Sequence, residues 1–204
     1  MTLSEFDNEI RKDYNVVCGC DEAGRGPLAG DVFAAAVIFD KDTVIEGIND
    51  SKKLTAKKRE ELFDEIMEKA VDFSIQTATV EEIEDINILN AAMLAMKRAV
   101  EDMDTKPDVC LIDGNKTPEG LECPAIAVVK GDAKSQAVAA ASILAKVARD
   151  RYMQQMAELY PEYRFEKHKG YGTKLHYQMI DQYGPCGIHR MSFLKKYYAK
   201  KNGH

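Results

Sequence analysis

Apolar residues along this chain fall into short runs typical of strands and longer stripes typical of helices. Val16 to Cys20 and Val32 to Phe39 are apolar, β-branched runs separated by a Gly/Pro-rich connection, and both predict strands. Residues 71 to 79 are apolar or threonine at every second position, which predicts a half-buried strand. Asp108 to Ile112 and Ala125 to Val129 predict two further short strands.

Helical periodicity fills most of the remaining chain. Thr55 to Ala70 has a single apolar stripe. A capping box of Thr79 and Glu82 begins a helical stretch that runs to about Met103, with Asn87 and Asn90 as candidate breaks. The remaining predicted helices are Lys134 to about Leu159, whose alanines suit close packing against a sheet, Thr173 to Tyr183, and Met191 to Tyr198.

This order of elements predicts an α/β fold with one mixed sheet and a helical C-terminal portion. The chain shows no internal repeat, low-complexity tract or long linker. We therefore expect one domain over residues 1–204, with a helical C-terminal extension from about residue 160.

Composition places the chain among ordinary soluble proteins. Of its 204 residues, 45% are hydrophobic and 30% are charged, and no apolar run is long enough to span a bilayer. The N-terminus has neither the basic flank nor the apolar core of a signal peptide, so we expect a cytoplasmic protein with no membrane partner. The cysteines number five and are expected to be reduced, packed thiols, because no second Cys or His pair follows Cys18 and Cys20 to complete a zinc site.

A net charge of −6 argues mildly against nucleic-acid binding, but the basic residues are clustered. One cluster covers residues 52–59, a second covers residues 164–174, and lysines at 195, 196, 200 and 201 follow. Any one of them can be simply a solvated face. The second cluster is interleaved with Tyr163, Phe165 and Tyr171, an arrangement that suits a nucleic-acid backbone and its bases.

Four acidic residues follow predicted strands. Asp21 and Glu22 follow the first strand, Asp113 follows the strand ending at Ile112, and Asp132 stands before the long helix. Acids at strand ends of an α/β sheet point into the crevice where such folds bind ligands. Taken singly, each has a simpler interpretation: Asp132 as a helix cap, Asp113 as a turn residue, and Asp21 with Glu22 as the start of a loop.

Four carboxylates meeting at one place would repel one another unless divalent cations lay between them. Ligands that are all oxygen select Mg²⁺ or Mn²⁺ over zinc. A pair of such ions suits phosphodiester hydrolysis without a protein nucleophile or a histidine. The four histidines, at 168, 176, 189 and 204, are indeed distant in sequence from the acids.

Residues 21 to 30 are the most specific segment. Gly24 and Gly26 would let the backbone approach a ligand sugar closely, and Arg25 adds a positive charge suited to phosphate. Gly24 to Ala29 also fits a loose dinucleotide-binding fingerprint. We reject that interpretation because a predicted strand follows instead of a helix, and because Asp21 and Glu22 would repel a pyrophosphate.

These residues resemble a known family. Residues 21–30 look like the N-terminal motif of the bacterial type 2 ribonucleases H, and six further segments match that family in order, from about Val16 to Phe193. The matching segments are Asp50–Thr55, Ile112–Gly114, Lys130–Asp132, Ala140–Asp150, His168–Thr173 and His189–Phe193.

The resemblance implies a ribonuclease H-like fold, with a mixed five-stranded sheet flanked by helices and a helical C-terminal segment that binds substrate. It implies cleavage of RNA paired with DNA, including a lone ribonucleotide in duplex DNA, which is cut on its 5′ side to leave a 3′-hydroxyl and a 5′-phosphate. The substrate partners are therefore RNA/DNA hybrids and ribonucleotide-containing DNA.

The resemblance also implies roles for individual residues. Asp21, Glu22, Asp113 and Asp132 would be the catalytic acids that bind Mg²⁺ or Mn²⁺. Gly24, Arg25 and Gly26 would recognise the ribose 2′-hydroxyl, and Tyr171 would stack on the next, deoxy, sugar. The residues expected to hold backbone phosphates are Ser51, Lys52 and Lys146.

Two further acids lie in or beside matching motifs. Asp31 occupies a position where the family usually has proline, and we interpret it as a surface variant in preference to an outer-shell carboxylate near the metals. Asp150 is interpreted as structural, because it lies about five helical turns beyond Asp132.

Two other functions remain open at this point. A different two-metal nuclease of the same fold, such as a resolvase- or transposase-like domain, would cut an all-DNA duplex equally well. A nucleic-acid-binding module without catalysis would keep its activity after Asp21→Asn. Monomer is the default oligomeric state, and the sequence gives no support for a sliding-clamp partner.

Overall fold

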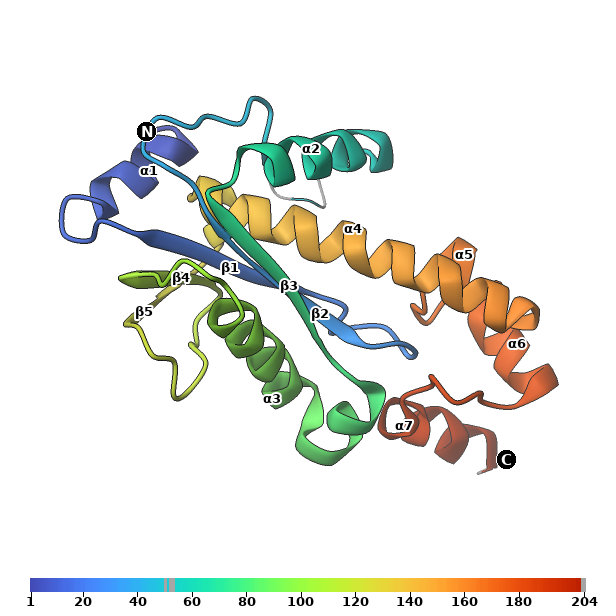
Figure 1. The fold of residues 1–204 in the computed structure, drawn as a ribbon. Coiled ribbons are helices and arrows are strands. Elements are labelled where there is room, and N and C mark those ends of the chain that lie inside the picture. The colour runs from blue at the N-terminus through green and yellow to red at the C-terminus, as the bar shows by residue number, and fades with distance from the viewer. Residues whose placement is uncertain (50, 52–53, 203–204) are drawn as a thin grey trace.

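A mixed five-stranded sheet forms the middle of the molecule (Figure 1). The structure, a computed structural model, describes residues 1–49, 51 and 54–202. The strand order is β3-β2-β1-β4-β5, with antiparallel pairing from β3 to β1 and parallel pairing of β4 with both β1 and β5. The strands are β1 (Val17–Ala23), β2 (Val32–Ile38), β3 (Asp72–Ala78), β4 (Val109–Asp113) and β5 (Ala125–Val128).

Helices cover both faces of this sheet, as the sequence predicts. Figure 1 shows α2 and α4 on one face and α3 on the other. The helices are α1 (Leu3–Ile10), α2 (Ala56–Lys69), α3 (Val80–Glu101), α4 (Gln136–Leu159), α5 (Phe165–His168), α6 (Lys174–Tyr183) and α7 (Met191–Asn202), with short 3₁₀ turns η2 (Gly131–Ala133) and η3 (Pro161–Tyr163). Within the described residues, none of these helices has both the length and the apolar character that crossing a membrane requires.

The side chains of four residues cap the starts of the longer helices. Thr55, Thr79, Ser135 and Thr173 each accept a hydrogen bond from a backbone N–H in the first turn of α2, α3, α4 and α6. The predicted starts of α2, α3 and α6 are therefore confirmed to within a residue. For α4 the cap is Ser135, so the alternative in which Asp132 caps this helix is wrong.

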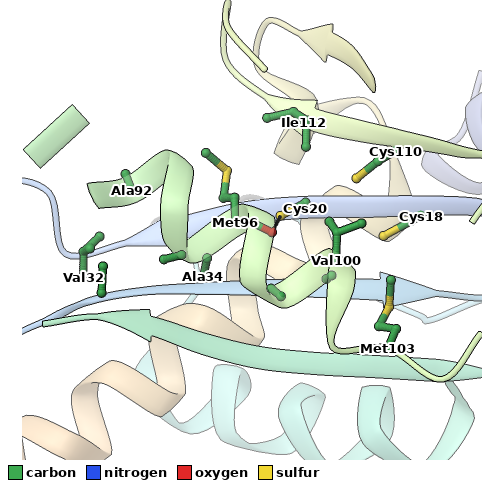
Figure 2. Packing of buried hydrophobic residues seen from close by; sticks show 14 of the residues in the cluster. Cys18, Cys20, Val32, Ala34, Ala92, Met96, Val100, Met103, Cys110 and Ile112 are labelled. Atoms are coloured by element: carbon green, nitrogen blue, oxygen red, sulfur yellow. Dashed lines mark hydrogen bonds between the residues drawn. The ribbon is translucent and has the colours of Figure 1, made fainter. Parts of the chain in front are cut away.

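The face covered by α3 has a core of small residues and sulfur atoms (Figure 2). Cys18 and Cys20 of β1 and Cys110 of β4 are buried there, and the Cys20 thiol lies 3.9 Å from the carbonyl oxygen of Met96 in α3. Burial raises the pKa of Cys20, which keeps it a neutral thiol. All five cysteines are free, so the prediction of reduced, packed thiols is confirmed for these three and extends to the half-buried Cys123 and Cys186.

The opposite face shows why α4 begins with alanines. A Cβ added at Gly19 of β1 would lie 2.2 Å from the carbonyl carbon of Ala137 and 2.3 Å from the nitrogen of Val138. The backbones of the helix and the strand are therefore in direct contact at this point, which only small residues allow. The prediction that this helix packs closely against a sheet is confirmed.

The long helix α3 is kinked at one of the two predicted asparagines. Asn87 has φ 67° and ψ 163°, and its side-chain oxygen accepts hydrogen bonds from the N–H groups of Leu89 and Asn90. Asn87 thus ends the first half and caps the second, because Asn adopts positive φ more readily than most residues and also makes a good cap. Asn90 itself lies inside the second half.

The C-terminal helices gather at the end of the sheet where β1 turns into β2 (Figure 1). The connection between these strands enters their core through Leu28 and Ala29, which are buried with Met153, Phe165 and Leu194. Backbone hydrogen bonds fix the contact: Leu28 N–H donates to the Gly170 carbonyl, and Arg190 N–H donates to the Leu28 carbonyl, each at 2.8 Å. The β1–β2 connection is therefore held by the C-terminal part of the chain.

Candidate active site

Two neighbouring parallel strands bring three of the predicted acids together. Cys20 of β1 pairs with Ile112 of β4, so the next residues along, Asp21 and Asp113, reach the same edge of the sheet. Both strands are longer here than the sequence predicts. Asp21 and Glu22 lie within β1, and Asp113 is the last residue of β4. Regular strand backbone therefore sets the positions of all three.

The charges of these acids interact strongly. Asp21 is 6% exposed, and its pKa is raised well above the ordinary value, first by burial and then by the neighbouring Glu22 and Asp113 carboxylates. Hydrogen bonds from the Ser142 side chain and the Glu22 N–H partly offset this effect. The site therefore holds more negative charge than its own donors neutralise.

The Asp113 and Glu22 carboxylates each contact a donor of their own. Asp113 Oδ1 accepts a 2.6 Å hydrogen bond from the Gly131 N–H, and Glu22 Oε1 lies 3.2 Å from Arg25 Nη1. The Asp113 bond crosses from β4 to the segment that follows β5. The simpler interpretation of Asp113 as a turn residue is therefore insufficient.

The fourth predicted acid, Asp132, lies in the same segment that follows β5. Asp132 is 8% exposed and lies in η2, directly after the Gly131 whose N–H binds Asp113. Lys130, before it, has a left-handed backbone with φ 57°, so the chain turns sharply on leaving β5. This turn places Asp132 next to the residue that contacts Asp113.

A cleft of about 210 Å³ lies beside the acids. It collects eight of the residues predicted for the site, from four separate parts of the chain. These are Asp21, Glu22, Gly24, Arg25, Gly26, Ser51, Lys146 and Tyr171, joined by Ala23 and Ser142. Asp113 and Asp132 do not line this cleft, and Lys52 lies outside the described residues.

One face of α4 supplies the side of the cleft opposite β1. Ser142, Lys146 and Arg149 are spaced by four and three residues, which places them on one helical stripe. The Ser142 hydroxyl lies 2.9 Å from that of Ser51, and Lys146 Nζ lies 2.6 Å from Asp150 Oδ1. Sequence reasoning missed Ser142, although its spacing from Lys146 was a usable signal. Asp150 is the ion-pair partner of Lys146, in keeping with a structural role.

Tyr171 forms the rim of the cleft. Its side chain is 43% exposed, and the Lys146 ammonium and Arg149 guanidinium lie 6.0 and 5.9 Å from the centre of its ring. A Cβ added at Gly26 would approach this ring to 3.7 Å. The missing side chain at Gly26 therefore leaves open the space between the loop and the ring.

The other aromatic residues of the second basic cluster are not available to a ligand. Tyr163 is 2% exposed and Phe165 is fully buried, and their rings stack on each other with centroids 5.3 Å apart. The expectation that these two rings stack on nucleic acid is wrong. Their spacing reflects the core beneath α5, and Tyr171 alone of the three reaches the surface.

Two buried arginines hold the β1–β2 connection, and sequence reasoning missed both. Arg149 is 1% exposed and donates to the carbonyls of Ala29, Asp31 and Lys169. Arg190 is 0% exposed and donates to four carbonyls in the same connection. Nothing in a single sequence separates such arginines from surface ones, except that both fall in motifs already singled out.

Asp31 belongs to this arrangement. Its Oδ1 accepts a 3.0 Å hydrogen bond from the Val80 N–H at the start of α3, and both buried arginines help to lower its pKa, although burial raises it overall. The interpretation of Asp31 as a surface variant stays a prediction. The residue is half-buried and ties the start of β2 to α3.

Three histidines, His168, His176 and His189, are buried close to the backbone of Tyr171. His189 Nδ1 accepts the Cys186 N–H at 2.9 Å, so the ring proton is on Nε2, which lies 3.0 Å from His176 Nε2. His176 must then be protonated on Nδ1, which donates to the Tyr171 carbonyl at 3.0 Å. Burial lowers the pKa of both His176 and His189 to about 4, so this chain of rings is neutral at pH 7.

The donors at the acid cluster fit a hard divalent cation by their chemistry. They are all carboxylate oxygens, and their mutual repulsion is what such an ion relieves. Across residues 1–49, 51 and 54–202, however, no three His, Cys, Asp or Glu side chains are arranged to share one ion. In this structure Asp113 accepts from the Gly131 N–H, and Glu22 pairs with Arg25.

Comparison with known proteins identifies the family. A family model described as ribonuclease HII matches residues 18–196. The chain belongs to the ribonuclease HII family. Members of this family cleave the RNA of RNA/DNA hybrids, and the chain is a ribonuclease H.

Individual relatives agree over most of the chain. Ribonuclease HII of Caldicellulosiruptor saccharolyticus is 56% identical over 189 residues, which cover 93% of this chain and 92% of that protein. The crystal structure of ribonuclease H2 from Pyrococcus horikoshii OT3 has a TM-score of 0.72 at 29% identity and covers 87% of this chain and 93% of that one. RNase HII of Archaeoglobus fulgidus, in a structure of its complex with PCNA, has a TM-score of 0.67 at 25% identity, covering 86% and 94%. The predicted ribonuclease H-like fold is thereby confirmed.

Proposed function

We propose that this ribonuclease HII hydrolyses the RNA strand of RNA/DNA hybrids and also cuts 5′ to single ribonucleotides embedded in duplex DNA. The products would carry a 3′-hydroxyl and a 5′-phosphate. One observation carries this proposal: the acid cluster at the ends of β1 and β4 borders a cleft lined by Gly24, Arg25, Gly26 and Tyr171. Carboxylates for phosphodiester chemistry and groups for reading a sugar thus lie side by side.

The acids would hold two Mg²⁺ or Mn²⁺ ions through Asp21, Glu22, Asp113 and Asp132. When bound, such ions supply Lewis-acid activation of water and stabilisation of the leaving oxygen. The chain contributes a rigid support for the carboxylates, because β1 and β4 pair directly up to the acids. It also contributes donors to the outer oxygens, namely the Ser142 hydroxyl to Asp21 and the Gly131 N–H to Asp113.

Substrate would lie along the cleft between the β1–β2 connection and α4. The backbone at Gly24, Arg25 and Gly26 would contact the 2′-hydroxyl, because Gly26 leaves open the approach to the Tyr171 ring. Tyr171 would stack on the following deoxyribose. Lys146 and Ser51 would meet phosphates from the α4 side, and Lys52, outside the described residues, keeps the same role by resemblance alone.

The C-terminal part of the chain would serve as a substrate-binding extension of a single catalytic domain. Tyr171 supports this division, because it is the residue beyond 160 that lines the cleft. We keep monomer as the proposed oligomeric state. We place it in the cytoplasm, acting in ribonucleotide excision repair.

A cleavage map of a duplex with one embedded ribonucleotide tests this function. We expect a single cut on the 5′ side of the ribonucleotide, lost in EDTA and restored by excess Mg²⁺ or Mn²⁺. The matched control is the same duplex with deoxyribose throughout, which should remain intact. Equal cutting of that control would show a general two-metal nuclease instead.

A further inference from the structure

The guanidinium of Arg190 donates only to backbone carbonyls of the connection between β1 and β2. Nη2 donates to Gly24 at 2.7 Å, and Nη1 donates to Arg25 at 3.2 Å and to Pro27 at 2.9 Å. Nε and Nη2 both donate to Gly30, at 2.8 and 2.6 Å. A single side chain, from the residue directly before α7, thus binds four carbonyls within seven residues.

These bonds fix the direction of the peptide groups at the glycines. In a trans peptide the C=O of one residue and the N–H of the next point in opposite directions, and the described chain has no cis bond. With the carbonyls of Gly24 and Arg25 turned toward Arg190, the N–H groups of Arg25 and Gly26 must point away from it. Neither N–H has an acceptor among the described residues. Both are therefore available to a ligand in the cleft.

The connection needs this support because it has little regular structure of its own. Gly24 has φ 102° and Gly30 has φ 86°, and the residues between them make no strand pairing apart from one bridge of Ala29 with His189. A buried arginine is costly unless every donor is used. No carboxylate among the described residues lies within ion-pair distance of Arg190, so the carbonyls are its main partners. Its guanidinium also lies 5.3 Å from the centre of the Phe193 ring.

We propose that Arg190 is a positioning residue for sugar recognition, holding the Gly24–Gly26 backbone so that the N–H groups of Arg25 and Gly26 face the 2′-hydroxyl of the substrate. This inference rests on the proposed function, because it takes a ribose as the ligand of the cleft. Lysine keeps the charge at 190 but has a single nitrogen, which cannot hold four carbonyls at once.

The test is binding selectivity, measured as the ratio of two dissociation constants. Fluorescence anisotropy with Ca²⁺ in place of Mg²⁺ would compare a duplex holding one ribonucleotide with the same duplex in all-deoxy form. For Arg190→Lys we expect the preference for the ribonucleotide duplex to fall about tenfold, with affinity for the all-deoxy duplex within about twofold of the wild type. A ratio measured within one preparation does not depend on the fraction of folded protein.

Arg11→Lys is the matched control. Arg11 also donates to a backbone carbonyl, that of Phe39 at 2.7 Å, but it follows α1 and lies outside the cleft. This control should keep the wild-type ratio. If Arg190→Lys keeps that ratio too, even with a lower melting temperature, Arg190 is merely structural and the inference is overturned.

A second variant covers the case in which Arg190→Lys does not fold. Phe193→Leu leaves the guanidinium in place and removes the ring that packs on it. We expect a fall in the ratio of about threefold, and an unchanged ratio in this variant would also overturn the inference. If the wild type itself shows no preference for the ribonucleotide, the proposed function fails, which is a separate outcome.

Discussion

Two clusters of polar side chains lie inside this protein, and they are satisfied to very different degrees. In the histidine cluster, His189 and His176 use both ring nitrogens in a single directed chain that ends on the Tyr171 carbonyl. In the acid cluster, Asp21 is buried beside Glu22 and Asp113, and the three charges repel one another. The first cluster is complete within the chain, whereas the second needs a positive charge from outside.

The difference shows that burial of a titratable group does not by itself indicate catalysis. Burial shifts the pKa in both clusters, toward the neutral form in each case. The two clusters differ in their partners. The neutral histidines find hydrogen-bond partners within the chain, whereas the charged carboxylates do not find enough positive charge there. The histidines stabilise the fold, and His176 binds the Tyr171 carbonyl. The acids repel one another and so lower the stability of the fold at the proposed active site.

The largest expected effect is on turnover. Asp21→Asn should lower the cleavage rate of a single-ribonucleotide duplex by about a thousandfold, because it removes a charge from the proposed metal site while keeping the side-chain shape. The free energy of unfolding should not fall, since the repulsion with Glu22 and Asp113 is relieved. Rates and urea denaturation curves check both. A variant that is much less stable, or one that still turns over normally, contradicts the assignment of Asp21.

The next effect concerns the pH dependence of stability. His176 has a folded pKa of about 4 against an ordinary 6.5, so the unfolded state binds more protons between these values. Its contribution is therefore present above about pH 6.5 and is lost as pH falls toward 4, a change of roughly 3 kcal/mol at most.

Asp7 complicates the measurement, because burial raises its pKa to about 6 and its contribution changes with pH in the opposite direction. The comparison is therefore between the wild type and His176→Phe at each pH. Their difference in unfolding free energy should shrink as pH falls from 6.5 to 4. A difference that stays constant with pH would mean that the ring is not held neutral.

The smallest expected effect is stabilisation by cations. Mg²⁺ at ten times its dissociation constant should stabilise the wild type by about 1.4 kcal/mol. His176→Phe should keep this response and Asp21→Asn should lose most of it, as measured by thermal unfolding with and without Mg²⁺. An equal response in both variants would place the cation elsewhere.

Sequence patterns predict the order of elements well, because apolar periodicity and capping residues act locally. The starts of α2 and α6 at Thr55 and Thr173 are examples. The ends of the elements depend less on local sequence. The first strand was predicted to stop at Cys20 but continues to Ala23, because β2 pairs with it through Asp21 and Glu22. Helix α1 is not among the predicted helices, although Thr2 and Glu5 form a capping box there.

The structure brings together predicted site residues where a motif is contiguous, whereas packing decides the placement of others. The residues from Asp21 to Gly26 line the cleft as expected. The burial of Tyr163 and Phe165, by contrast, depends on the C-terminal helices that cover them, and no spacing rule reports this. The buried Arg149 and Arg190 are likewise defined by the carbonyls around them, and those in the β1–β2 connection lie over a hundred residues away in sequence.

The contact of Gly19 with the start of α4 also determines the width of the cleft. Ser142 and Lys146 follow Ala137 along a straight helix, about 7 and 14 Å further on. A single methyl group at Gly19 would push the N-terminal end of α4 away from β1. Ser142 and Lys146, which line the cleft from α4, would then move away from β1 as well. The distance between the two sides of the cleft thus depends on the absence of a side chain at Gly19, a buried residue that does not line the cleft.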